Sequence, residues 1–262
     1  MTEFLNFIAA TKAKRTCDFY SHHLKIILDY FKNNDLEFNS SSLVKFVLYQ
    51  KQKGLNENTI GYRIMCLKKY LEFMNIESDI KDFPVLKNND FCPDFLDPIE
   101  IKELIKHVQS SNISLENKLI IFLVLETGVR LNELRFIKCS NIDLLNRKIL
   151  LEVTKTRKKR TVFFSDLSYS ILKDYDLSSE YLINKTCSGI QKVFFRLRDK
   201  LGYDKLSPHL LRHTYSTLLI RNGASILLVN KTLGHTSIKT TMRYIHIMTD
   251  EFKKEYDQYF KV

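Results

Sequence analysis

The chain has 262 residues, of which 44% are hydrophobic and 12% aromatic, enough to bury the core of one large domain or two ordinary domains. It holds only 7 Gly and 4 Pro, and its longest apolar run is far shorter than the roughly 18 residues of a membrane span. Collagen-like, low-complexity and membrane-spanning proteins are therefore excluded. The net charge of +11 favours nucleic acid as a partner, although a ribosomal or other lysine-rich protein would share it.

The N-terminus carries an acidic residue, Glu3, where a secretory signal has basic residues, and no apolar stretch leads to a cleavage site. We therefore expect a cytoplasmic protein. The five cysteines are scattered, with no CxxC pair and no Cys/His pair at metal-binding spacing. They are expected to be reduced thiols with structural roles.

Residues 1–83 are predicted to form a small helical domain. Apolar residues recur there at intervals of three to four, as at Ile60, Ile64, Leu67 and Leu71, which is the period of an amphipathic helix. The predicted helices cover residues 2–11, 16–32, 41–53 and 58–74. This domain shows no chemical motif of its own.

A linker is predicted over residues 84–98, because three of the four prolines, Pro84, Pro93 and Pro98, fall within it. The positive charge is uneven on its two sides. Residues 99–262 hold 28 basic and 17 acidic side chains, whereas the first 83 residues hold 12 and 10. The excess charge belongs to the second domain.

The chain after the linker is predicted to be mainly helical, with one small antiparallel β-sheet. Residues 148–154 (KILLEVT) and 161–164 (TVFF) are rich in β-branched and aromatic residues and flank a basic connection, which predicts a β-hairpin. Helices are expected at residues 98–110, 115–127, 132–137, 188–201, 208–221, 226–233 and 238–244, with a helical tail from residue 249.

Four of the seven histidines, His209, His213, His235 and His246, lie within 38 residues near the C-terminus. The first two belong to the predicted helix SPHLLRHTYSTLL. There His209, Arg212 and His213 follow one another at i, i+3 and i+4, so they share one face of the helix. Such clustering indicates a functional site.

This histidine helix does not have the pattern of a zinc site, because Leu210 stands where HExxH needs its glutamate and a third ligand is missing. An imidazole beside a guanidinium suits a phosphate instead, since arginine offers paired donors and histidine can move a proton near neutral pH. The stretch TGVRLNEL adds Arg130 just after a helix end and an acid, Glu133, one turn later. Phosphoryl chemistry is the working hypothesis.

Together with LGHTSIKTTMRYIH, residues 233–246, these motifs resemble the tyrosine recombinase family of phage integrases and Xer-type recombinases. That family is marked by an arginine in TGxRxxEL, a lysine in a β-hairpin, an HxLRH helix, an LGH turn and a tyrosine nine residues later. The matching residues here are Arg130, Lys155, His209, Arg212, His235 and Tyr244. The stretch LNENTIGYRIMCLKKYLEFM also resembles the last long helix of the family's core-type DNA-binding domain.

The resemblance implies a compact two-domain form without an additional arm-binding domain. It assigns residues 1–83 to a helical core-type DNA-binding domain and residues 99–262 to a tyrosine recombinase catalytic domain. The two would form a clamp that closes on opposite sides of duplex DNA. The chemistry implied is cleavage of DNA without a metal or other cofactor: Tyr244 attacks the scissile phosphate and forms a 3′-phosphotyrosyl link, while Arg130 and Arg212 hold the non-bridging oxygens.

The remaining site residues also receive roles. A phenol with a pKa of about 10 must lose its proton in the reaction, and His209 is the matching general base. Lys155 would protonate the 5′-oxygen leaving group. His235 would form a hydrogen bond with the phosphate, and Glu133 would support the site by orienting its side chains.

The basic connection of the hairpin is a further candidate for DNA contact. It departs from the family's glycine-flanked pattern, with threonines on both sides of Lys155, so Lys158 is the alternative general acid. The residues predicted to bind DNA are Arg157, Lys158, Lys159 and Arg160.

The implied function is site-specific DNA recombination, for integration and excision or for dimer resolution, by a cytoplasmic, nucleoid-associated enzyme. Its partner would be double-stranded DNA with two inverted half-sites, each bound by one protomer. Two paired sites give a tetramer. The apolar stripe in the last residues, as at Phe252, Tyr256 and Tyr259, would form the C-terminal helix that joins protomers.

Two other functions are alternatives. A type IB topoisomerase or a telomere resolvase would rejoin the strand after swivelling or as a hairpin. A regulator that kept the fold would bind DNA without cleaving it. Covalent trapping on nicked DNA separates the silent regulator from the enzymes.

Overall fold

The structure is a computed structural model that describes residues 1–86, 93–152, 159–235 and 237–242, without the side chains of residues 239 and 240. The chain divides into two compact units, Met1–Phe91 and Cys92–Val262. Each unit has its own hydrophobic core. We describe them separately.

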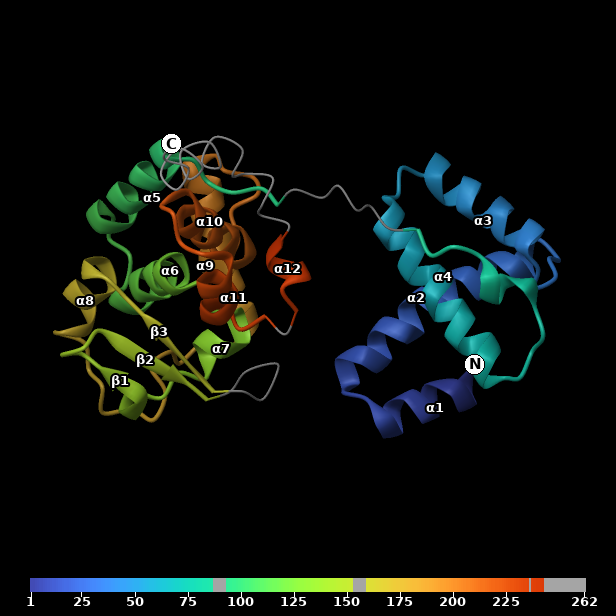
Figure 1. The fold of residues 1–262 in the computed structure, drawn as a ribbon, viewed down its shortest axis with the longest axis horizontal. Helices are drawn as coiled ribbons and strands as arrows, with labels where there is room; N and C mark the ends of the chain where they lie inside the picture. The colour runs from blue at the N-terminus through green and yellow to red at the C-terminus, as the bar shows by residue number, and fades with distance from the viewer. Residues whose placement is uncertain (87–92, 153–158, 236, 243–262) are drawn as a thin grey trace, which may run out of the picture. The chain divides into compact units, whose positions relative to one another are not determined.

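The described residues of the first unit, 1–86, form a bundle of four α-helices and one short 3-10 helix (Figure 1). Leu24 and Ile27 of one helix pack against Ile60, Ile64 and Leu67 of another, and all five are fully buried. All four predicted helices are present, and their ends lie within two residues of the prediction. They are α1 (Thr2–Thr11), α2 (Lys14–Asn33), α3 (Ser40–Gln52) and α4 (Glu57–Phe73), followed by η1 (Asp79–Asp82).

Both ends of the predicted linker pack against a core. Val85 and Leu86 lie on the core of the first unit, and a Cβ atom at Gly61 of α4 would collide with the carbonyl oxygen of Leu86. Leu96 is buried in the second unit, where its N–H donates to Thr214 Oγ1 at 2.9 Å. The chain therefore enters each unit through a fixed contact.

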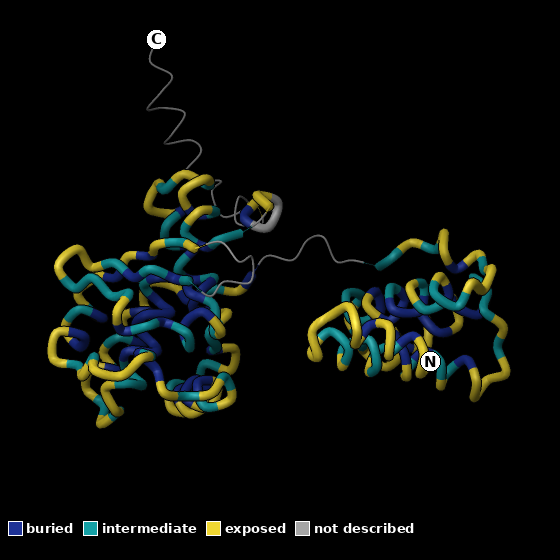
Figure 2. Tube along the Cα trace, turned by 90° about the horizontal axis from the view of Figure 1, so that it is seen from below, coloured by how far each residue is buried: buried dark blue, intermediate teal, exposed yellow. Residues whose placement is uncertain are grey.

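The second unit is mainly helical. Its centre is α6 (Leu115–Thr127), whose residues Leu119 to Leu125 are all buried because helices and a strand surround it. Figure 2 shows the buried residues inside this unit in dark blue. The other helices are α5 (Pro98–Ser110), α7 (Leu131–Arg135), α8 (Asp166–Leu172), α9 (Cys187–Leu201), α10 (Pro208–Arg221), α11 (Ile226–Leu233) and α12 (Lys239–Met242), with the 3-10 helix η2 (Cys139–Asn141).

A three-stranded antiparallel sheet lies beside α8 in this unit (Figure 1). The order is β1 (Ile142–Asp143), β2 (Lys148–Leu151) and β3 (Arg160–Phe163), and Leu151 pairs with Arg160 across the hairpin. The predicted hairpin is confirmed, while β1 and α8 were not predicted. The mainly helical fold with a small antiparallel sheet is also confirmed.

The predicted tail from residue 249 lies outside the described residues, as does the end of the predicted helix 238–244. Among the helices that the structure describes, none has the length and apolar character needed to cross a membrane.

Candidate active site

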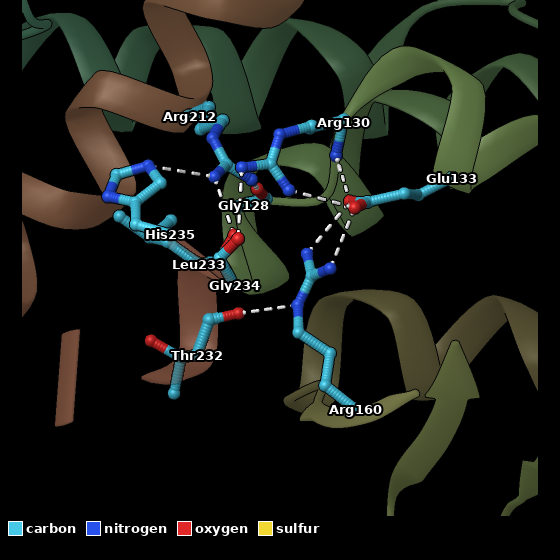
Figure 3. Close-up of polar contacts among 9 residues, drawn as sticks. All are labelled: Gly128, Arg130, Glu133, Arg160, Arg212, Thr232, Leu233, Gly234 and His235. Atoms are coloured by element: carbon cyan, nitrogen blue, oxygen red, sulfur yellow. Dashed lines mark hydrogen bonds and ion pairs between the residues drawn. The ribbon is translucent and has the colours of Figure 1, made fainter. Parts of the chain in front are cut away.

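Three predicted phosphate-binding residues meet on one turn, the Leu233–Gly234–His235 stretch where α11 ends (Figure 3). Arg212 donates to the Leu233 carbonyl, and Arg130 donates to the next carbonyl, that of Gly234, at 3.2 Å. The Arg212 Nη2 atom also lies 3.2 Å from His235 Nε2. Residues from α10, from the start of α7 and from the turn after α11 are thus brought together.

Two glycines make this meeting possible. Gly128 ends α6 with φ of 59°, and Gly234 ends α11 with φ of 61°, a left-handed conformation that glycine adopts without strain. A side chain would also lack space: a Cβ at Gly128 would lie 2.5 Å from the Tyr215 ring, and one at Gly234 would lie 3.0 Å from Arg160. The backbone conformation therefore explains the glycine of the TG pair and the glycine of the LG pair in the sequence motifs.

Arg212 joins the ends of the two helices. Its side chain is buried on α10, where it donates to the Gly128 carbonyl at the end of α6 and to the Leu233 carbonyl, at 2.7 Å, at the end of α11. The carbonyl ends of helices carry a partial negative charge, which stabilises a buried guanidinium. A cation is thereby held rigidly next to His235.

Arg130 is fixed by Glu133, one turn later. The Glu133 carboxylate accepts two hydrogen bonds from Arg130, one from its backbone N–H at 2.8 Å and one from its side-chain Nη1 at 2.9 Å. Burial by itself would raise the pKa of Glu133, but the hydrogen bonds and charges of Arg160 and Arg130 outweigh it and hold the pKa below 4.5. Glu133 is therefore ionised at neutral pH and binds both arginines, while its supporting role in the reaction stays a prediction.

Arg160, the first residue of β3, also binds Glu133. Its Nη1 and Nη2 donate to the two carboxylate oxygens at 2.7 and 2.8 Å, and its Nε donates to the Thr232 carbonyl at 2.9 Å. The side chain is 9% exposed. Arg160 thus ties the hairpin to the site, whereas its expected contact with DNA stays a prediction.

The sequence carried a signal for this inward position. Val162 was predicted to lie in a strand, and alternate residues of a strand share a face, so Arg160 falls on the same side as buried Val162. Lys159, by contrast, points outward: its side chain is 64% exposed and pairs with Glu152 at 3.0 Å. The basic connection therefore combines an internal and an external cation.

His209 begins the same helix as Arg212, in a first turn where Ser207 caps the helix and Pro208 fits without a lost hydrogen bond. The residue is exposed, but partial desolvation and then the charges of Arg212 and Arg130 lower the pKa of its imidazole below 6.5. A neutral imidazole at neutral pH can accept a proton. His213 lies next to it, with ring centroids 6.4 Å apart.

His235 has a defined environment on both sides of its ring. Its Nε2 faces Arg212, and its Nδ1 lies 2.8 Å from the hydroxyl of Thr241 in α12. Thr241 is fully buried, and its hydroxyl donates to Asn230 Oδ1 at 2.9 Å. The motif search did not single out Thr241 or Asn230, because neither residue carries chemistry on its own.

The other predicted site residues cannot be placed. Lys155, Arg157, Lys158, Tyr244 and the C-terminal helix lie outside the described residues. Within the described part of the chain, histidine, cysteine and carboxylate side chains form no group of three or more that could hold a metal ion. The chemistry that the described side chains offer is binding of a phosphate by guanidinium and imidazole groups, with a neutral histidine nearby as a proton acceptor.

Comparison with known proteins gives a consistent result. Residues 94–251 match the model of the phage integrase family. The chain is 30% identical over 269 residues to tyrosine recombinase XerA of Saccharolobus solfataricus, covering 97% of this chain and 90% of that protein. It is 28% identical to a probable integrase/recombinase of Acholeplasma phage L2, covering 97% and 96% of the two chains.

A solved structure shares the fold. The Tn1549 transposon integrase in complex with transposon right end DNA superimposes with a TM-score of 0.78, at 19% identity and over 97% of each chain. The family match covers more than half of the chain, and the XerA match covers nearly all of it. The resemblance in the sequence motifs is therefore confirmed, and the chain belongs to the phage integrase family of tyrosine recombinases.

Proposed function

We propose that this site-specific recombinase breaks DNA by transferring the scissile phosphate to Tyr244. The observation that carries the proposal is the meeting of Arg130, Arg212 and His235 on the turn at residues 233–235. Two guanidinium groups and an imidazole that can be protonated, held in place before substrate binds, suit the extra negative charge of a five-coordinate phosphorane. Tyr244 follows this turn by nine residues.

The proposed step balances without a metal or cofactor. The Tyr244 oxygen forms a bond to phosphorus, and the bond from phosphorus to the 5′ oxygen breaks. His209 accepts the phenol proton, and Lys155, or Lys158 as the alternative, gives a proton to the departing 5′ oxygen. The phosphodiester energy is kept in the 3′-phosphotyrosyl bond, so attack by a different 5′ hydroxyl rejoins the DNA without ATP.

The assembly is part of the proposal. Both units would contact duplex DNA, with the second unit supplying most of the positive charge, since residues 99–262 hold its excess. Each inverted half-site would bind one protomer, and two paired sites would form a tetramer through the C-terminal helix. The cellular setting would be integration and excision of a mobile element or resolution of DNA dimers, in the cytoplasm at the nucleoid.

Covalent trapping tests the proposal. Nicked fragments of the source genome are incubated with the full chain, and the protein is then denatured in detergent. The DNA that stays covalently attached to the protein is sequenced. We expect attached fragments to share one inverted repeat, and Tyr244→Phe to bind DNA normally without forming the adduct. An adduct that persists in Tyr244→Phe would contradict the assignment of the nucleophile.

The same assay separates the alternatives. A catalytically silent DNA-binding regulator would give no adduct with the unmodified chain. A topoisomerase would trap at many unrelated sequences and relax supercoiled plasmid, and a telomere resolvase would convert the recovered site into hairpin ends. A recombinase instead exchanges strands between two labelled copies of that site.

A further inference from the structure

Thr241 and Asn230 form a chain of hydrogen bonds that ends on His235. The Thr241 hydroxyl lies 2.9 Å from Asn230 Oδ1 and 2.8 Å from His235 Nδ1, and Thr241 is fully buried. The chain crosses elements, because Asn230 belongs to α11 and Thr241 to α12. The His235 backbone N–H also binds the Asn230 carbonyl, which fixes the turn between them.

Counting protons assigns the direction of each bond. A threonine hydroxyl has one hydrogen and can accept with its lone pairs. Because Thr241 gives its hydrogen to Asn230 Oδ1, the contact with His235 requires that Nδ1 carries a hydrogen and donates it. The neutral imidazole of His235 then has its lone pair on Nε2, where the Arg212 Nη2 lies 3.2 Å away as a donor.

This arrangement determines how His235 can meet a phosphate. With Nδ1–H held by Thr241, Nε2 is the ring nitrogen whose proton can change, and it lies on the side of Arg212. When the ring takes up a second proton, on Nε2, this nitrogen can donate to a phosphate oxygen. The hydrogen bond then joins an imidazolium to a phosphate anion and is therefore strong. Among the charged groups, Arg212 contacts the ring directly, while Arg130 and Arg160 bind the neighbouring Gly234 and Thr232 carbonyls and share Glu133 (Figure 3).

We infer that Thr241 is a positioning residue for catalysis, which sets the tautomer of His235 so that Nε2 serves the phosphate. The inference rests on the proposed function and adds a link that the motif residues do not contain. Thr241 lies three residues before Tyr244, so one hydroxyl joins the start of the nucleophile's segment to the phosphate-binding histidine.

Nitrogen NMR of histidine-labelled full-length protein tests the tautomer directly. The spectrum is recorded at about pH 9, above the usual imidazole pKa of about 6.5, and His235 is identified by its loss in His235→Gln. We expect Nδ1 of His235 to show the shift of a protonated nitrogen and Nε2 that of an unprotonated one. The reverse pattern in the unsubstituted chain would overturn the inference.

Substitutions add a matched comparison. Thr241→Val keeps the branched shape but removes the hydroxyl, so the ring should gain Nε2–H, and single-turnover cleavage should fall on the order of tenfold. Thr241→Ser keeps the hydroxyl and should restore both readouts. Asn230→Ala removes the acceptor of the Thr241 hydroxyl hydrogen, which can then donate to His235 Nδ1. The fraction of His235 in the Nε2–H tautomer should therefore also rise, although Thr241 itself is unchanged.

A purely structural role for Thr241 predicts another outcome. Thr241→Val would then unfold more easily but leave the tautomer unchanged, as would Asn230→Ala, and the inference would fail. If Thr241→Val does not fold, Asn230→Ala decides the question alone. Failure of the proposed function is distinguishable from failure of this inference. If the unsubstituted chain formed no covalent adduct, nitrogen NMR would still determine the tautomer of His235.

Discussion

Each unit of the protein buries an arginine, and the two arginines have different surroundings. Arg63 of the first unit is 8% exposed and donates to the neutral amide of Gln50, while its Nε has no partner among the described residues. Arg212 of the second unit is 5% exposed and donates to two helix-terminal carbonyls beside His235. Burial of a cation therefore does not by itself identify a site.

The difference lies in what converges on each arginine. Around Arg212, the ends of α6 and α11 expose carbonyls, and Arg130, Arg160 and Glu133 complete a network with three guanidinium groups and one carboxylate. Burial lowers the pKa of Arg63, which shows that its environment disfavours the charge. A group that must hold an anion needs surroundings that favour the cation, as the second unit provides.

Replacing each arginine with lysine tests this comparison, and we expect the largest difference in DNA cleavage here. Arg212→Lys keeps the charge but loses the paired donors, so single-turnover cleavage of a trapped site should fall on the order of a hundredfold or more. Arg63→Lys is the matched control and should leave cleavage per folded molecule within about twofold, since Arg63 lies in the other unit. Equal losses in both variants would contradict the assignment of Arg212.

His209 should set the acid limb of the cleavage rate. Desolvation, and then the charges of Arg212 and Arg130, hold the pKa of its imidazole below the ordinary value, so the midpoint for loss of the neutral base by protonation lies below pH 6.5. We expect the cleavage rate to fall at pH values under 6.5. His209→Gln should lower the rate on the order of a hundredfold and remove this limb. If the cleavage rate of His209→Gln still falls at acidic pH, the general base is another group.

Glu133 offers a comparison of stability between the units. Glu133→Gln removes the charge partner of Arg130 and Arg160 and should lower the free energy of unfolding by about 3 kcal/mol. Glu57→Gln is the control in the first unit, where the Lys51–Glu57 pair is 46% exposed on both sides, and should cost less than about 1 kcal/mol. Urea unfolding of the two variants measures both values, and equal losses would contradict the structure.

The pH dependence of this loss has a definite sign. The folded-state pKa of Glu133 is below 4.5, so its ion pairs stabilise the fold fully above that value and less as the pH falls through the folded pKa. The difference in unfolding free energy between the unsubstituted chain and Glu133→Gln should therefore shrink on acidification. A difference that grows would mean that Glu133 is protonated in the folded protein.

The smallest effect concerns the outward cation of the hairpin. Lys159→Gln should reduce the salt dependence of non-specific DNA binding by up to one phosphate contact, or about 0.9 in the slope of log K against log salt. Lys173→Gln, directly after α8, makes the same charge change at a side chain that is 53% exposed. An equal effect of the two substitutions would show that the hairpin has no special place at the DNA.

Much of the fold followed from the sequence, because long amphipathic and buried helices carry a strong periodic signal. The helices at Glu57–Phe73 and Leu115–Thr127 were predicted within one residue. The two-residue strand β1 and the seven-residue α8 were missed, since segments that short contain too few turns or alternations to show a period.

The site was predictable to the extent that each residue carried chemistry in a motif. Arg130, Arg212 and His235 were identified in this way, and the structure brings them to one turn. The inward orientation of the Arg160 side chain was missed because the whole run of basic residues was interpreted as a surface that contacts DNA. Thr241 could not be found from the sequence, since its part depends on where α11 and α12 meet.

Mapping of the DNA adduct on the chain tests the central claim most directly. The trapped complex is digested with nuclease and trypsin, and cleavage after Arg243 and Lys253 releases YIHIMTDEFK, in which Tyr244 is the sole tyrosine. The proposed chemistry predicts that mass spectrometry finds a nucleotide joined through its 3′ phosphate to Tyr244. A nucleotide on another residue, or a link through a 5′ phosphate, would contradict it.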